Sequence, residues 1–223
     1  MKRLCTMLFL VFFTSIGLQA QQFGGSLAVS GNQVFAGESR QGTFPGIVYV
    51  LEATNGEWQE VAQLMAGEEF GPPDGFGRAI AVQGRLMIVG APLTEDGAGT
   101  VYGFRADADG NWTLSGSFAA GTPSEEAGFG SAVVLNGDLA IVSAPGDEAG
   151  AVHVFRLGAD GWAEEAILRS SDEAARRFGS SLAIDGDIVL AEFAGDAGCP
   201  CDGRGVPIRR YYVFVDVARH VGR

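Results

Sequence analysis

Residues 76–104 read FGRAIAVQGRLMIVGAPLTEDGAGTVYGF, and this stretch decides the fold of the 223-residue chain. It begins with a Phe-Gly pair and continues with a turn at Gln83 and Gly84, an apolar run, the triplet Gly-Ala-Pro and a second apolar run that ends at Phe104. Short apolar runs between turns indicate strands, although four residues alone do not exclude a helix. The stretch therefore predicts short strands joined by turns.

The same order of features returns along the chain. Four Phe-Gly pairs, separated by 53, 53 and 49 residues, begin at Phe23, Phe76, Phe129 and Phe178. A fixed period of this length is typical of stacked supersecondary units. A Gly-containing turn follows each pair after about eight residues, and its Asn-Gly and Asp-Gly forms favour tight hairpins. The repeats are expected near residues 23–75, 76–128, 129–177 and 178–223.

The second half of a repeat predicts two further strands. The third strand carries one ring side chain, at Tyr49, Tyr102 or His153. A turn then leads into the three tryptophans, Trp58, Trp112 and Trp162. Six residues later stands a large apolar residue, which the period of two places on the tryptophan's face: Leu64, Phe118 and Leu168. Each unit is therefore one four-stranded antiparallel sheet, and radial repetition of such sheets builds a β-propeller.

These features resemble the FG-GAP repeat family, whose units build the propeller of integrin α subunits. The fullest match runs from Phe76 through Gly90-Ala91-Pro92 to Tyr102, and residues 129–155 come next. The first copy has Glu38 and Ser39 in place of Ala-Pro, and the fourth has Glu192 to Ala194 there. The resemblance covers residues 23–223 and implies an all-β, propeller-like array of four-stranded antiparallel blades with about four repeats.

The resemblance also raises the question of calcium. Several integrin repeats place an Asp-rich calcium loop in the first hairpin, but here that hairpin is as short as Asn136 to Asp138 and leaves no room for six or more oxygen ligands. The acidic stretch from Asp107 to Asn111 lies in the other hairpin, and a turn explains its composition. No cofactor is predicted, and calcium stays an open alternative that no motif of the sequence supports.

The first twenty residues predict a secretory signal peptide. A basic start at Lys2 and Arg3 precedes the apolar run from Leu8 to Phe13, and cleavage is expected after Ala20. The apolar run is too short for a membrane span, although an uncleaved anchor is the alternative. The sequence thus predicts a repeat domain over residues 21–223 that is periplasmic or extracellular, with no membrane span after cleavage.

Charge and loop length point to one face of the array. A net charge of −12 argues against binding to nucleic acid, which needs a cationic surface. The long loops, which follow the second strand and connect the blades, share one face of the blades, and such loops usually carry binding residues. The candidate ligand-binding residues on this long-loop face are Glu68, Glu69, Glu95, Asp96, Glu125, Glu126, Asp147 and Glu148. The alternative is a solvated acidic surface that only maintains solubility.

No catalytic constellation emerges from the sequence. It contains no nucleophile-elbow serine, no HExxH and no phosphate-binding loop. We therefore expect a secreted, non-enzymatic binding or adhesion module that takes a protein or glycan ligand on its long-loop face. The alternatives are a carbohydrate-binding or carbohydrate-degrading propeller and a truncated fragment of a longer adhesin.

The C-terminal segment departs from the repeat. Cys199 and Cys201 could form a strained disulfide, remain free thiols or bind zinc with Asp202 or His220. Tyr212 and its neighbours resemble a third strand, but no tryptophan strand follows, so an incomplete last blade is expected. Three explanations stay open: a small propeller, an open array that associates through its exposed edges, and a truncated or frame-altered product.

Overall fold

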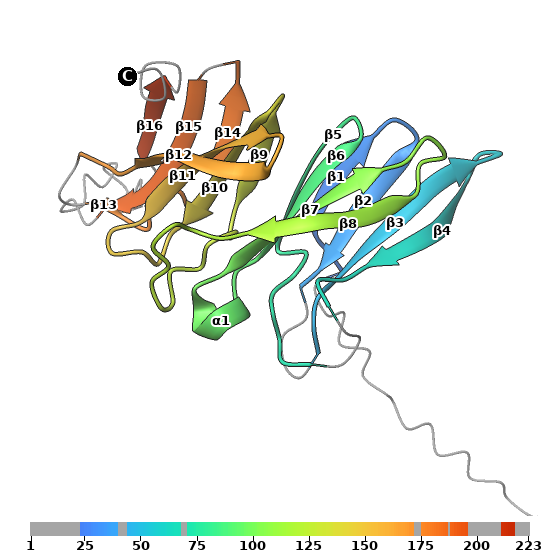
Figure 1. The fold of residues 1–223 in the computed structure, drawn as a ribbon, viewed down its shortest axis with the longest axis horizontal. Helices are drawn as coiled ribbons and strands as arrows, with labels where there is room; N and C mark the ends of the chain where they lie inside the picture. The colour runs from blue at the N-terminus through green and yellow to red at the C-terminus, as the bar shows by residue number, and fades with distance from the viewer. Residues whose placement is uncertain are drawn as a thin grey trace, which may run out of the picture.

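The computed structural model describes residues 23–39, 44–67, 71–171, 175–186, 188–195 and 211–216. These residues form four antiparallel sheets and one short helical turn (Figure 1). The predicted signal peptide, Glu68, Glu69, Cys199 and Cys201 lie outside the described residues. Within that part of the chain, no helix is long and apolar enough to cross a membrane.

The sheets follow the repeats in chain order and are called blades 1 to 4. Blade 1 contains β1 (Phe23–Ser30), β2 (Gln33–Glu38), β3 (Ile47–Thr54) and β4 (Glu57–Leu64). Blade 2 contains β5 (Ala79–Gln83), β6 (Leu86–Ala91), β7 (Thr100–Ala106) and β8 (Trp112–Phe118). Blade 3 contains β9 (Val133–Asn136), β10 (Leu139–Ala144), β11 (Ala151–Gly158) and β12 (Gly161–Leu168).

Blade 4 contains β13 (Ala175–Arg176), β14 (Leu182–Asp185), β15 (Ile188–Gly195) and β16 (Tyr211–Asp216). The strand β15 pairs with all three of the others, and β13 and β14 pair with different ends of it. Among the described residues, blade 4 therefore repeats the first three strands of the other blades, with no counterpart of the tryptophan strand.

The first hairpin of each blade closes through a glycine in the left-handed region. Gly31, Gly84, Gly137 and Gly186 have φ angles of 61°, 59°, 62° and 55°. Glycine adopts this conformation without the steric penalty of a Cβ atom, which is why the turn recurs with Gly at the same place. The tight hairpins predicted from the sequence are present in all four blades.

Neighbouring blades pack through their first strands, β1 on β5, β5 on β9 and β9 on β14. The phenylalanine of the Phe-Gly pair fills each junction, because Phe76, Phe129 and Phe178 are at most 1% exposed. Close approach of the backbones requires Gly90, since a Cβ atom there would overlap the carbonyl oxygen of Gly130. The motif residues that define the repeat are thus the residues that join one blade to the next.

A β-bulge in the outer hairpin of blades 1, 2 and 3 changes which face the fourth strand presents. In blade 2 the register shifts between Gly103 and Phe104, and the other two blades have the same shift. As a result Trp112 faces blade 1 and packs edge-on against Phe35, with ring centroids 5.3 Å apart. On the same strand, Phe118 faces blade 3.

The contacts of Phe118 show the other side of this arrangement. Its ring centroid lies 4.7 Å from that of Phe155 and 5.4 Å from that of Trp162, both in blade 3. The prediction that each tryptophan shares a face with the apolar residue six positions later is therefore wrong. The extra residue of the bulge inverts the alternation between them, so that one strand packs on both neighbours.

The array is open, with blades 1 and 4 at its two ends (Figure 1). Blade 1 leaves one face uncovered: Phe23, Leu27, Val29 and Trp58 are 60%, 65%, 66% and 58% exposed. The equivalent Trp112 is only 8% exposed, because blade 1 covers it. Blade 1 thus carries the surface that blades 2 to 4 bury against a preceding blade.

Candidate functional site

The long-loop face gathers the β6–β7 loop and the connections between the blades (Figure 1). The β6–β7 loop contains α1 (Thr94–Gly97), a single turn where the sequence predicts only a loop. Glu95 and Asp96 within it have φ angles of 50° and 56°. This left-handed conformation is unfavourable by roughly 1–2 kcal/mol for residues other than glycine, so the surrounding structure must hold it.

Backbone hydrogen bonds join α1 to the connection between blades 2 and 3. The amide of Glu126 donates to the Asp96 carbonyl at 3.4 Å, and the amide of Gly128 donates to the Gly97 carbonyl at 2.8 Å. Glu126 and Glu148 also have left-handed φ angles, of 57° and 53°. Of the six candidate residues that the structure describes, four are therefore held in this strained conformation, on adjoining segments.

Among the candidates that the structure describes, Asp147 has the carboxylate that makes the most contacts within the protein. Its Oδ1 accepts a hydrogen bond from the Ser124 hydroxyl at 2.9 Å, and its Oδ2 accepts one from Arg169 Nη2 at 2.8 Å. The Asp147 side chain is 14% exposed, whereas the neighbouring Glu148 is 81% exposed. Asp147 ties the β10–β11 loop to the connections before and after blade 3, and the exposed Glu148 lies 3.5 Å from Arg169 Nη1.

A hollow of about 320 Å³ opens beside the loops that carry these acidic candidates. It is lined by Ser39, Gly75, Arg78, Pro92, Leu93, Gly97, Glu126, Gly128 and Ser131, which come from blades 1, 2 and 3 and their connections. Arg78 is exposed and supplies a positive charge, and Leu93 is 49% exposed and supplies an apolar contact. Of the six candidates that the structure describes, only Glu126 lines the hollow itself.

Sequence reasoning missed Arg78 and Leu93. Arg78 stands directly after a Phe-Gly pair, where the other repeats have Gly25, Ser131 and Ser180. Leu93 follows Gly-Ala-Pro, where blade 3 has Gly146. A comparison of the repeats position by position, looking for charged or bulky exceptions beside the motif, would have found both residues.

Asp74 organises the long-loop side of the first junction. Its Oδ1 accepts hydrogen bonds from the amides of Gly46 and Phe76, at 2.8 and 2.9 Å, and so links the β2–β3 loop to the Phe-Gly pair of blade 2. Burial raises the pKa of the nearby Tyr102, and the negative charges of Asp74 and Glu95 raise it further. The acidic loops therefore act electrostatically on the junction beneath them.

The acidic stretch at Asp107 forms the turn that its composition predicts. Asp107 Oδ1 accepts hydrogen bonds from the amides of Asp109 and Asn111, both at 2.9 Å, and Oδ2 accepts one from Asn111 Nδ2 at 3.0 Å. These hydrogen bonds, that from the Asn111 side chain foremost, lower the pKa of Asp107. Across the described segments, no group of three or more His, Cys, Asp or Glu residues is arranged to hold a metal ion.

Comparison with known protein families identifies the repeat. The FG-GAP repeat model matches residues 58–104 and 112–155. The chain carries FG-GAP repeats. Each match begins at the tryptophan strand of one blade and ends in the third strand of the next, so the FG-GAP sequence unit is offset from the structural blade by one strand.

Comparison with solved structures found chains of similar architecture. A protein from Lactobacillus plantarum is 17% identical and superimposes with a TM-score of 0.53, over 86% of this chain and 55% of that protein. This chain thus spans about half the length of the Lactobacillus plantarum protein. A GH43 endo-arabinanase from Bacillus licheniformis is 11% identical, with a TM-score of 0.44 over 84% of this chain and 71% of the arabinanase. A search of curated proteins found no match. The fold of this FG-GAP chain is propeller-like.

Proposed function

We propose that this FG-GAP chain is a secreted, non-enzymatic binding or adhesion module that engages its ligand through the long-loop face. The observation that carries the proposal is the hollow lined by Arg78, Leu93 and Glu126, to which three blades contribute. Strained residues held by surrounding structure are frequent where a surface has to be preorganised for a ligand. The basic and apolar start of the chain, Lys2 to Phe13, supports secretion.

The charge of the face suggests the chemistry of the partner. Glu95, Asp96, Glu125 and Glu126 are exposed, and their carboxylates form no ion pair with any residue that the structure describes. The negative charge of these four carboxylates would attract a protein surface or peptide that carries Lys and Arg side chains. Leu93 would then contribute an apolar contact at the edge of the hollow.

An array of basic and neutral peptides tests this function. The wild-type chain is expected to bind basic peptides, and a variant with Glu95→Gln, Asp96→Asn, Glu125→Gln and Glu126→Gln should bind at least about tenfold more weakly. The matched control removes the same number of charges on other surfaces, with Glu57→Gln, Glu60→Gln, Asp109→Asn and Asp185→Asn. Equal weakening by both variants, or no binding of basic peptides by the wild type, would refute a specific long-loop site.

The open face of blade 1 supports self-association as part of the proposal. Its exposed Leu27, Val29 and Trp58 form a surface of the kind that monomers rarely leave uncovered. At the other end of the array, Glu192 occupies the position that the smaller Gly37, Gly90 and Ser143 hold in blades 1, 2 and 3. Because Glu192 hinders a further blade from packing there, association is expected through two blade 1 faces related by a two-fold axis.

A further inference from the structure

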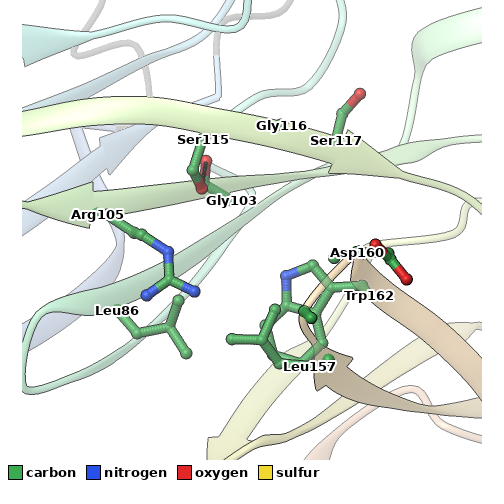
Figure 2. Close-up of a pocket in the computed structure, with 12 residues that line it drawn as sticks. Leu86, Gly103, Arg105, Ser115, Gly116, Ser117, Leu157, Asp160 and Trp162 are labelled. Carbon is green, nitrogen blue, oxygen red and sulfur yellow. Dashed lines mark hydrogen bonds between the residues drawn. The ribbon is translucent and has the colours of Figure 1, made fainter.

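A second hollow, of about 400 Å³, lies between blades 2 and 3 on the side away from the long loops. Figure 2 shows the residues that line it. Blade 2 contributes Leu86, Gly103, Arg105 and residues 115–117, and blade 3 contributes the β11–β12 turn, residues 157–162. The Arg105 guanidinium and the Trp162 indole lie on opposite sides of it (Figure 2). This hollow shares no residue with the site proposed above.

A pair of glycines lines the hollow. Gly103 and Gly116 are cross-strand partners in blade 2. The equivalent partners are Val50 and Ala62 in blade 1 and Val154 and Ala166 in blade 3. A Cβ atom on Gly103 would lie 3.6 Å from Trp162 Nε1, so a larger side chain would fill the space in front of the indole. Of these three blades, only blade 2 has glycine at both positions.

Among the described residues, the indole N–H of Trp162 has no acceptor, in contrast to its counterpart at the first junction. Trp112 Nε1 donates to Gln33 Oε1 at 2.9 Å, and Gln33 is held in turn by Glu52. At the second junction, the residues in the places of Gln33 and Glu52 are Leu86 and Arg105. Neither side chain can accept a hydrogen bond, so no described residue satisfies the Trp162 N–H.

The Arg105 side chain also lacks a hydrogen-bond partner among the described residues. The equivalent Arg156 in blade 3 donates to Glu165 at 2.7 Å and to Asp138 at 2.9 Å, and these hydrogen bonds raise its pKa. The Arg105 side chain makes no hydrogen bond or ion pair with any part of the chain that the structure describes. Two donor groups therefore face one hollow, and neither donates to a residue that the structure describes, which is an arrangement suited to the oxygen atoms of a ligand.

We propose that this hollow binds a neutral sugar unit. Sugar hydroxyl oxygens would accept hydrogen bonds from Trp162 Nε1 and Arg105, and a sugar hydroxyl could donate to Asp160 at the rim. The C–H face of the sugar ring would pack on Leu86, Leu157 and the indole. The net charge of −12 and the carboxylate of Asp160 disfavour an anion as the source of those oxygens. The volume falls within the usual range of small-molecule sites.

The test follows the indole N–H signals of the three tryptophans by NMR while maltose, cellobiose, xylobiose or arabinobiose is added. Tryptophan-to-phenylalanine variants assign the three signals. The expected result is a saturable shift of the Trp162 signal with at least one of these neutral disaccharides, while the Trp58 and Trp112 signals stay in place. Acetate and inorganic phosphate are the anion arm, and neither should reproduce the shift.

Three variants make the test specific. Gly103→Val introduces the residue that blades 1 and 3 carry and should abolish the shift. Arg105→Gln should weaken binding about tenfold, and because Arg105 is exposed this variant leaves the packing of the core unchanged. Arg156→Gln is the matched control at the same repeat position and should leave the affinity unchanged. The proposal is overturned if no disaccharide shifts Trp162, if acetate or phosphate shifts it equally, or if Arg105→Gln and Arg156→Gln have the same effect.

Discussion

The phenylalanine of the Phe-Gly pair has two environments in this protein. Phe129 is 1% exposed and lies among the rings of Phe118, His153 and Phe155, whereas Phe23 at the same repeat position is 60% exposed. Phe129→Ala is expected to lower the free energy of unfolding by about 3–5 kcal/mol, because it leaves a cavity at a blade junction. Phe23→Ala should lower it by less than about 1 kcal/mol. Chemical denaturation of both variants measures the difference, and similar losses would contradict the junction described above.

The raised pKa of Tyr102 gives a pH dependence. Because folding raises this pKa, the stabilising contribution of neutral Tyr102 is fully present below the tyrosine's unfolded pKa, near 10, and is lost as the pH rises through the higher folded value. Glu95→Gln should lower the pKa of Tyr102, whereas Glu57→Gln, on a different strand, should not change it. Ultraviolet titration measures this, with Tyr102→Phe identifying the signal. An unchanged titration in Glu95→Gln would show that the charge of Glu95 does not reach Tyr102.

Single residues were predictable where the repeat fixes them. The positions of the three tryptophans and of the phenylalanine in each Phe-Gly pair follow from the spacing alone. Their exposure does not, because Trp58 and Trp112 occupy the same repeat position and differ only in whether a blade lies in front of them. The hollow at Trp162 was also missed, since Gly103, which leaves space in front of the indole, looks like any other of the chain's 34 glycines.

The glycines at the blade junctions determine how closely the strands of neighbouring blades can approach each other. Gly90→Ala would place a methyl group against the Gly130 carbonyl and push β6 away from blade 3, which should destabilise the protein by about 1–3 kcal/mol. Gly67→Ala is the matched control, because nothing lies within 4 Å of a Cβ atom there. Thermal unfolding of the two variants provides the comparison. If both melt alike, the close approach of the strands at Gly90 does not limit packing.

The strands themselves were largely predictable, but the bulges were not. Turn glycines and apolar runs mark β6, β7, β10 and β11 clearly, because these central strands are buried on both faces. The extra residues of the bulges in blades 1, 2 and 3 are Val61, Ser115 and Glu165. These three residue types share no property from which a bulge could be predicted. A strict period of two therefore assigned the wrong face to the second half of the tryptophan strands.

At the scale of the whole molecule, the uncovered face of blade 1 predicts weak self-association. Light scattering coupled to size exclusion should show a concentration-dependent dimer of residues 21–223, more populated at high salt. Salt screens the repulsion between the two chains, each of charge −14 without Lys2 and Arg3. Leu27→Glu with Val29→Glu should give a monomer. Leu114→Glu, at a side chain that is 51% exposed in blade 2, should leave the dimer intact. A wild-type monomer at every concentration and salt level would be the contrary result.

The bulged fourth strand, which packs on one neighbour through its tryptophan and on the other through its last apolar residue, bears on how the protein unfolds. A blade bound in this way cannot open toward one side without loosening its contact on the other, so unfolding should spread from blade to blade as nearest-neighbour coupling. Amide hydrogen exchange should then be slow and concerted in β6, β7, β10 and β11. It should be fastest in β1, because only blade 2 packs against blade 1 in the part of the chain that the structure describes.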